Sequence, residues 1–217
     1  MPTIYDKLPT LEHALLEVLA KFIREDEGTF HNWEIAVFLP AANAYIHYLD
    51  GVNFSLKKNN YLSAMANLRG LIECLGAVVY DGTAKLPQEA YTKFLKSGRL
   101  PKWDEDKNKW VGLGVGELVE NAAKVLSKDI ELKKVYNHCC DMLHFSAQHM
   151  PFLGGFNPQV DEDKRIVTFK IGAQDNIPVE KQVELIDLCV ELTNALGRCI
   201  GAAIGEKQER AAARNKA

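Results

Sequence analysis

The stretch YLSAMANLRGLIECLGAVVY, residues 61–80, decides the fold class. Its large apolar residues recur at the spacing of one helical face: Leu68, Leu71, Ile72, Leu75, Val78 and Val79. The residues on the opposite side are all small: Ser63, Ala66, Gly70, Cys74 and Ala77. Because no charged face is left for solvent, we expect this helix to lie at the centre of a helical bundle, with a neighbour packed closely on its small side.

Only two charges occur in this stretch, Arg69 and Glu73. They lie four residues apart, a spacing at which side chains on a helix meet. A charge rarely enters so apolar a helix unless it is paired. One hypothesis is a buried structural ion pair that fixes how the helices pack. The other is that Arg69 binds an anion in a cleft, with Glu73 orienting its guanidinium group.

The composition is that of a folded globular protein. The chain has 217 residues, of which 47% are hydrophobic and 25% charged, and its net charge is −3. We therefore expect one domain, residues 1–217, large enough to bury a full core. Neither sign of charge dominates, so nothing in the totals indicates DNA binding.

The amino terminus lacks the basic start and apolar core of a secretion signal. Without such a signal, the five cysteines indicate reduced thiols in a cytoplasmic protein. No predominantly apolar stretch of about 18 residues is free of charge, so we predict no membrane span and no membrane partner.

Helical periodicity covers most of the rest of the chain. It predicts a first helix capped by Thr10 and ended by Gly28, and a second that Pro40 kinks or restarts. Asp81-Gly82 is expected to close the central helix, and residues 97–112 are interpreted as a polar surface flap. Further helices are predicted at residues 88–95, 117–126 and 129–149, and from Pro178 onward.

The period changes between the last two predicted helices. Residues 156–160 and 165–171 flank a turn-like DEDK sequence, and apolar residues alternate with polar ones, which predicts a β-hairpin inserted at about residues 152–172. The mixed-charge end, about residues 206–217, is expected to fray. The fold class is therefore all-α: a five- to six-helix up-and-down bundle with a small β-hairpin before the last helix.

The segment YNHCCDMLHFSAQHM, residues 136–150, holds the second group of polar residues. On a helix running to His149, Asn137, Asp141, His144 and Gln148 share one stripe. His144 suits acid–base chemistry, with Asp141 one turn away to hold the imidazole tautomer. The alternative interpretation is a solvated helix face.

A metal site is the other chemistry that this segment suggests. Cys140 and His144 have the spacing of two ligands on one helix, but His138 and His149 project away from His144. No CxxC or HExxH motif is present. We predict no metal and no cofactor.

Three glycines recur every fourth residue in the last predicted helix: Gly197, Gly201 and Gly205. Each costs about 1 kcal/mol of helix propensity relative to alanine. Close approach of another backbone would compensate, and that backbone belongs either to an internal neighbour or to a second copy of the chain.

The segments ANLRGLIEC, residues 66–74, and VYNHCCDMLHFS, residues 135–146, carry a family resemblance. An L-R-x-L-x-E helix followed by a Y-x-x-x-x-x-x-x-H-x-S helix is typical of a group of bacterial helical proteins of unknown function. The match to the second motif runs through Tyr136, His144 and Ser146. The chain resembles this group over roughly residues 33–151, and the group is similar to the HEPN superfamily.

That resemblance implies a helical bundle that is often dimeric. Many HEPN proteins are metal-independent ribonucleases of toxin–antitoxin and phage-defence systems. Their catalytic signature places an arginine four to six residues before a histidine on one helix, whereas no arginine occurs between Lys134 and His144 here. Arg69 is the candidate to supply that cation from the neighbouring helix.

Three functions follow from these patterns. The first is a cytoplasmic, dimerising HEPN-like interaction module with an internal Arg–Glu–His polar cluster; the alternatives are a HEPN-like ribonuclease, with RNA as partner, and a small-molecule or nucleotide-binding bundle. The candidate catalytic residues are His144, Arg69, Glu73 and Asp141. The candidate binding residues are Asn137, Tyr136, Gln148 and Ser146. Whether the chain is an enzyme stays open at this point.

Overall fold

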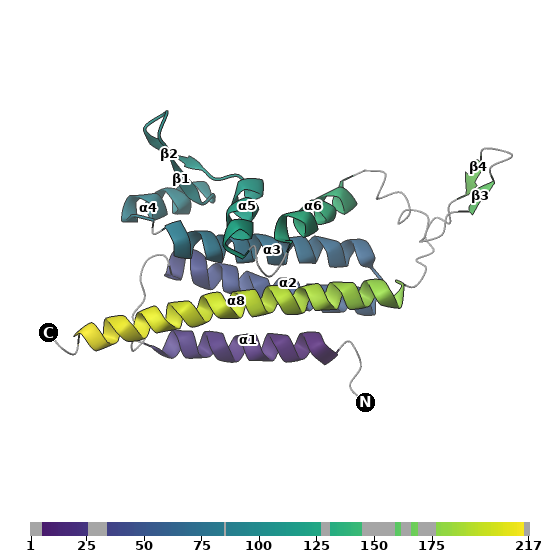
Figure 1. The fold of residues 1–217 in the computed structure, drawn as a ribbon, viewed down its shortest axis with the longest axis horizontal. Coiled ribbons are helices and arrows are strands. Elements are labelled where there is room, and N and C mark those ends of the chain that lie inside the picture. Colours follow the sequence, from purple (N-terminus) through teal and green to yellow (C-terminus); the bar gives the residue numbers. More distant parts are fainter. Residues whose placement is uncertain are drawn as a thin grey trace.

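A computed structural model describes residues 6–25, 34–84, 86–126, 131–144, 159–161, 166–168 and 177–214. Within these ranges the chain is a helical bundle with two small antiparallel hairpins (Figure 1). The helices are α1 (Lys7–Arg24), the π-helical η3 (Glu34–Phe38), α2 (Leu39–Lys57), α3 (Tyr61–Ala84), α4 (Gln88–Ser97), α5 (Val115–Leu126), α6 (Leu132–Leu143) and α8 (Val179–Arg214). The strands are β1 (Pro101–Asp104), β2 (Lys109–Gly112), β3 (Gln159–Asp161) and β4 (Ile166–Thr168). The predicted fold class is confirmed.

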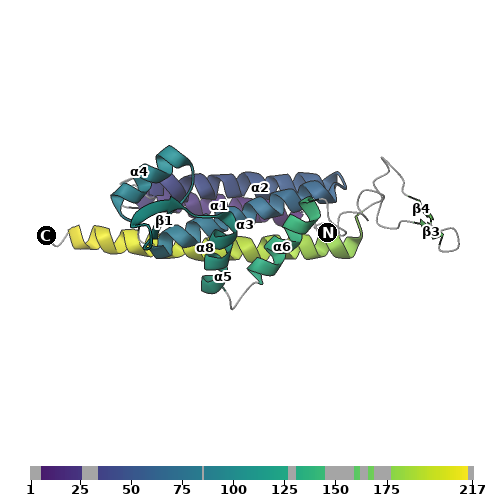
Figure 2. The ribbon, with the colours of Figure 1, turned by 90° about the horizontal axis from the view of Figure 1, so that it is seen from above.

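Helix α3 lies at the centre, as its composition predicts. It contacts η3, α2, α5, α6 and α8, and from above α5 and α6 cross α3 and α8 (Figure 2). All six residues of its apolar face are buried. On the small side, a Cβ added to Gly70 would lie 2.7 Å from ring atoms of Tyr48 on α2. The small residues therefore let α2 pack closely against α3.

Helix α3 also runs further than predicted. It does not close at Asp81-Gly82 but continues to Ala84. Asp81 is only 3% exposed, and its Oδ1 accepts a 2.7 Å hydrogen bond from the Tyr91 hydroxyl on α4. A partner ten residues away thus keeps a turn-forming residue inside the helix.

The other predicted helix ends have mixed outcomes. Helix α1 begins at Lys7, so Thr10 is not its cap; the Thr10 hydroxyl donates a 2.8 Å bond to the Asp6 carbonyl one turn earlier. Gly28 lies outside the described residues. Helix α2 restarts after η3 with Pro40 in its first turn, as predicted, because proline needs no N–H partner there.

Helix α8 spans 36 residues, about 54 Å at the usual helical rise, and packs along α1 and α3. The end expected to fray is helical through Arg214. Lys207 is fully buried there, with its Nζ 4.5 Å from the ring centre of Phe22 on α1. Contact with an aromatic face stabilises this cation, so the charged end packs instead of fraying.

The first hairpin was not predicted. Residues 97–112 are interpreted from the sequence as a polar flap, but Pro101 pairs with Gly112 and Trp103 with Trp110 in register. The two indole rings lie edge to face, 5.2 Å apart, and this cross-strand pair holds strands that are otherwise polar. The turn between them contains Asn108 at φ 46°, a conformation that asparagine tolerates.

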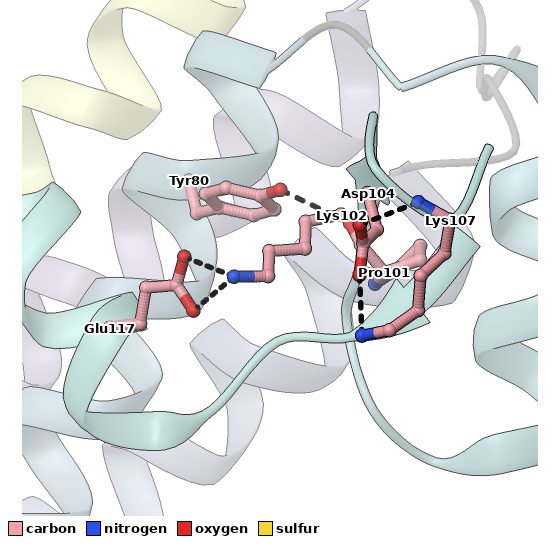
Figure 3. A network of polar contacts seen from close by, with 6 residues as sticks. All are labelled: Tyr80, Pro101, Lys102, Asp104, Lys107 and Glu117. Atoms are coloured by element: carbon pink, nitrogen blue, oxygen red, sulfur yellow. Dashed lines mark hydrogen bonds and ion pairs between the residues drawn. The ribbon is translucent and has the colours of Figure 1, made fainter. Parts of the chain in front are cut away.

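Polar contacts tie this hairpin to the bundle (Figure 3). The Tyr80 hydroxyl of α3 donates to the Pro101 carbonyl at 3.1 Å. Lys102 Nζ lies 2.7 and 2.8 Å from the two carboxylate oxygens of Glu117 on α5. Within the hairpin, Lys107 bonds Asp104 through both its amide and its Nζ. The hairpin is therefore anchored over the carboxyl end of α3.

The second hairpin confirms the predicted insertion. Strands β3 and β4 pair antiparallel with Val160 opposite Val167, inside the two segments that the alternating pattern marked. Helix α8 begins at Val179, next to the predicted start at Pro178.

Among the described residues, two helices are long and apolar enough to cross a membrane by length and composition alone: Tyr61–Gly82 and Val179–Arg214. The first is the central helix of the bundle, and a core helix passes the same test. These lengths are therefore weak evidence for a membrane span.

Candidate functional site

The Arg69–Glu73 pair forms as its spacing predicts. Arg69 Nε donates to Glu73 Oε1 at 2.8 Å, and this hydrogen bond raises the pKa of Arg69 further above its ordinary value. The side chains are 30% and 33% exposed, respectively. The pair is therefore partly solvated, so the expectation of a buried pair is wrong, while its structural role stays a hypothesis.

Tyr136 of α6 completes the cluster. Its hydroxyl donates to the same Glu73 Oε1 at 3.3 Å, and the Arg69 guanidinium carbon lies 5.5 Å from the centre of its ring. Burial and the Glu73 charge raise the pKa of Tyr136 to about 12, so its hydroxyl stays a donor at neutral pH. We call Arg69, Glu73 and Tyr136 the Arg–Glu–Tyr cluster; it joins α3 to α6.

His144 does not belong to this cluster. Helix α6 ends at Leu143, and His144 takes an extended conformation, φ −86° and ψ 149°. Its side chain is exposed, and its backbone N–H donates to the Cys140 carbonyl at 2.8 Å. The prediction that His144 lies inside a helix reaching His149 is wrong. Among the described residues, no hydrogen bond or ion pair connects its imidazole to Arg69 or Glu73.

The polar stripe of α6 faces solvent. Asn137 and Asp141 are exposed and line an open depression of about 600 Å³ together with Lys133, Lys134 and His138. Ser146 and Gln148 lie outside the described residues. The stripe thus matches the alternative of a solvated helix face over the part that is described.

This geometry restricts the chemistry of the candidate residues. The terminal nitrogens of Arg69 carry N–H donors that suit an anion, and the side chain is accessible. General acid–base catalysis needs a titrating group within hydrogen-bond reach of the reacting atoms. Glu73 and Tyr136 are titratable groups in contact with Arg69, and they bond to each other. The Cys140 thiol also lies close enough to interact electrostatically with Arg69 and Tyr136.

The two buried cysteines, Cys139 and Cys189, and the possible metal ligands add no reactive centre within the described residues. All five thiols are free, and burial raises the pKa of Cys139 and of Cys189 to about 12, far from the range of a reactive thiolate. Across the described ranges, no three histidine, cysteine, aspartate or glutamate side chains are placed to hold a metal ion.

Sequence reasoning missed Asp81, which was assigned to a turn. Burial raises the pKa of its carboxyl group to about 6, and burial together with the bond to Asp81 raises the pKa of Tyr91 as well. A signal was present: on a helix continued past residue 80, Asp81 falls on the same small side as Gly70 and Ala77, which faces neighbouring helices.

Comparison with known proteins adds no assignment, because no family model, no curated protein and no solved structure matches this chain.

Proposed function

We propose that this chain is a cytoplasmic, HEPN-like helical interaction module that pairs with a second copy of itself through one edge of α8. The observation that carries the proposal is the environment of Gly197, Gly201 and Gly205. A Cβ added to any of them would meet no heavy atom within 4 Å. The glycines are therefore not explained by an internal neighbour in the described chain, and a second copy is the remaining compensation for their helix cost.

The geometry of α8 suits such a pairing. Residues four apart follow one edge of a helix, so the three glycines form a strip of small residues along its exposed side. A strip of this kind is self-complementary: two copies related by a twofold axis bring glycine against glycine and let the backbones approach closely. The buried face of α8 meanwhile stays packed on α1 and α3.

The Arg–Glu–Tyr cluster has a structural role in this proposal. It connects α3 and α6 through one carboxylate oxygen that accepts from both Arg69 and Tyr136. Such a contact holds the angle between two helices and needs no substrate. The ribonuclease alternative has less support, because the described contacts do not bring His144 to Arg69.

The oligomeric state tests the proposal directly. Sedimentation of the full chain over a wide concentration range is expected to show a reversible dimer. Gly201→Leu places a large side chain on the strip and is expected to give a monomer. The new side chain has room in the single chain, because a Cβ added to Gly201 meets no heavy atom within 4 Å. An unchanged circular dichroism spectrum will therefore confirm that the variant folds.

Gly116→Leu is the matched control. Gly116 lies in the first turn of α5 and is equally open, so the same substitution there should leave the dimer intact. A wild-type chain that stays monomeric at every concentration refutes the proposal, and so does a Gly201→Leu variant that dimerises like the wild type.

A further inference from the structure

A second feature, separate from the α8 strip, is a cavity of about 450 Å³ near the carboxyl end of α3. This size is within the range of small-molecule sites. It is lined by η3, α3, α4, α5 and α8 through Phe38, Val78, Val79, Asp81, Gly82, Leu86, Tyr91, Val125, Cys199, Ala202, Ala203 and Glu206. The lining is mostly apolar, and its carboxylates come from Asp81 and Glu206.

The cavity runs from an exposed rim to a buried floor. Gly82, Val125, Ala202 and Glu206 are exposed, whereas Asp81 and the residues around it are buried: Phe38, Val78, Val79, Tyr91 and Ala203. A molecule that enters from the rim therefore leaves water and meets apolar side chains. The charged residue of this buried part is Asp81, whose carboxyl group accepts a hydrogen bond from the Tyr91 hydroxyl.

Asp81 has unused hydrogen-bonding capacity at this floor. Its Oδ1 accepts from Tyr91 at 2.7 Å. Its Oδ2 is buried and has no hydrogen-bond partner among the described residues. An unpaired buried carboxylate oxygen costs free energy of folding, and a donor brought by a ligand removes that cost. A buried carboxylate oxygen without a partner calls for an explanation, and a binding site is one such explanation.

We propose that this cavity binds a small organic cation, a primary amine on an apolar body, with its ammonium group on Asp81 Oδ2. A charged donor matches a carboxylate better than a neutral one, because charge-assisted hydrogen bonds are about twice as strong. The described lining contains no lysine or arginine that would neutralise Asp81 from within. Glu206 at the rim adds a second negative charge, which favours the entry of cations and disfavours anions.

The apolar lining selects the rest of the ligand. Valine, leucine, phenylalanine and alanine side chains offer no further donors or acceptors around the floor. A sugar or nucleotide would therefore leave its polar groups without partners there, whereas a compact aliphatic or aromatic body would not. This site is independent of the proposed dimer, since it is built on the α3–α4 side of α8.

Three probes of equal shape test this inference on the full chain: benzylamine, benzyl alcohol and benzoate. Binding is followed by isothermal titration and by the carboxyl ¹³C resonance of Asp81. Benzylamine is expected to bind and to shift that resonance. Benzyl alcohol should bind at least about tenfold more weakly, and benzoate should not bind.

Variants locate the binding. Asp81→Asn keeps the side-chain shape and removes the charge, so it should lose at least about tenfold in benzylamine affinity. Asp141→Asn removes an exposed carboxylate of α6, outside the cavity, and should bind as the wild type does. Ala202→Trp fills the rim without touching the carboxylate and should block binding while the helical spectrum stays unchanged.

Several results would overturn the inference. They are equal binding of the three probes, benzylamine affinity that survives Asp81→Asn, and no shift of the Asp81 resonance at saturating benzylamine concentration. None of these results affects the dimer test, because that test measures the sedimentation of the chain in the absence of any probe.

Discussion

Removing the Arg69–Glu73 pair should destabilise the protein only modestly. With both side chains about one-third exposed, the pair resembles a surface ion pair, which contributes roughly 0.2–1 kcal/mol. Arg69→Ala also removes the guanidinium from the face of Tyr136, an interaction of about 0.5–1 kcal/mol at exposed sites. We therefore expect a total loss of about 1–2 kcal/mol, or a few degrees in Tm for a chain of this size.

A double-mutant cycle isolates the pairwise part. Urea unfolding of wild type, Arg69→Ala, Glu73→Ala and the double variant should give a coupling free energy of at most about 1 kcal/mol. The coupling should fall at high salt, because exposed charges are screened. Lys181→Ala is the control: its pair with Glu184 is exposed on α8, and its removal should change stability by less than about 0.5 kcal/mol.

A large coupling free energy would contradict this prediction. A coupling of 3 kcal/mol or more, insensitive to salt, is what a desolvated pair would give (about 3–5 kcal/mol on breaking one partner). That value would refute the reasoning from exposure and restore the buried-pair hypothesis.

Two further predictions follow from α3. Gly70→Ala places a Cβ 2.7 Å from the Tyr48 ring and should destabilise the folded protein by up to about 2 kcal/mol, after the gain in helix propensity is included. In the same helix, the Cβ of Gly82→Ala meets nothing within 4 Å, so this variant should stabilise the protein by about 0.5–1 kcal/mol. Equal effects of the two variants in thermal unfolding would contradict this prediction. The pKa of Asp81 is about 6 in the folded protein and about 3.9 in the unfolded chain. Because the folded state binds the proton more tightly, protonation of Asp81 stabilises the protein at low pH, and this stabilisation is lost as the pH rises through 6. Relative to Asp81→Asn, the wild type should therefore lose stability between about pH 4 and 7 in denaturant titrations, and a gap that does not change with pH would contradict the assignment.

Much of the fold follows from local pattern. Residues 61–80 contain an apolar arc and a small-residue side but no charged face, so this helix can only lie inside a bundle, and it does. The alternation in residues 156–171 located the second hairpin. The first hairpin escaped because its strands are polar and are held by one tryptophan pair and by contacts to α3 and α5. Those contacts involve residues distant in sequence, which a local pattern does not report.

In the candidate site, too, some contacts follow from local sequence spacing and others from the packing of whole helices. The bond between Arg69 and Glu73 follows from the sequence, because residues four apart on a helix are neighbours. The exposure of the pair, and its completion by Tyr136, 63 residues after Glu73, follow from the packing of α6 against α3. The tertiary structure also decided that His144 ends α6 and that Asp81 is buried against Tyr91. The physical reason is that helical geometry sets contacts within a turn, whereas burial and distant partners depend on how whole elements pack.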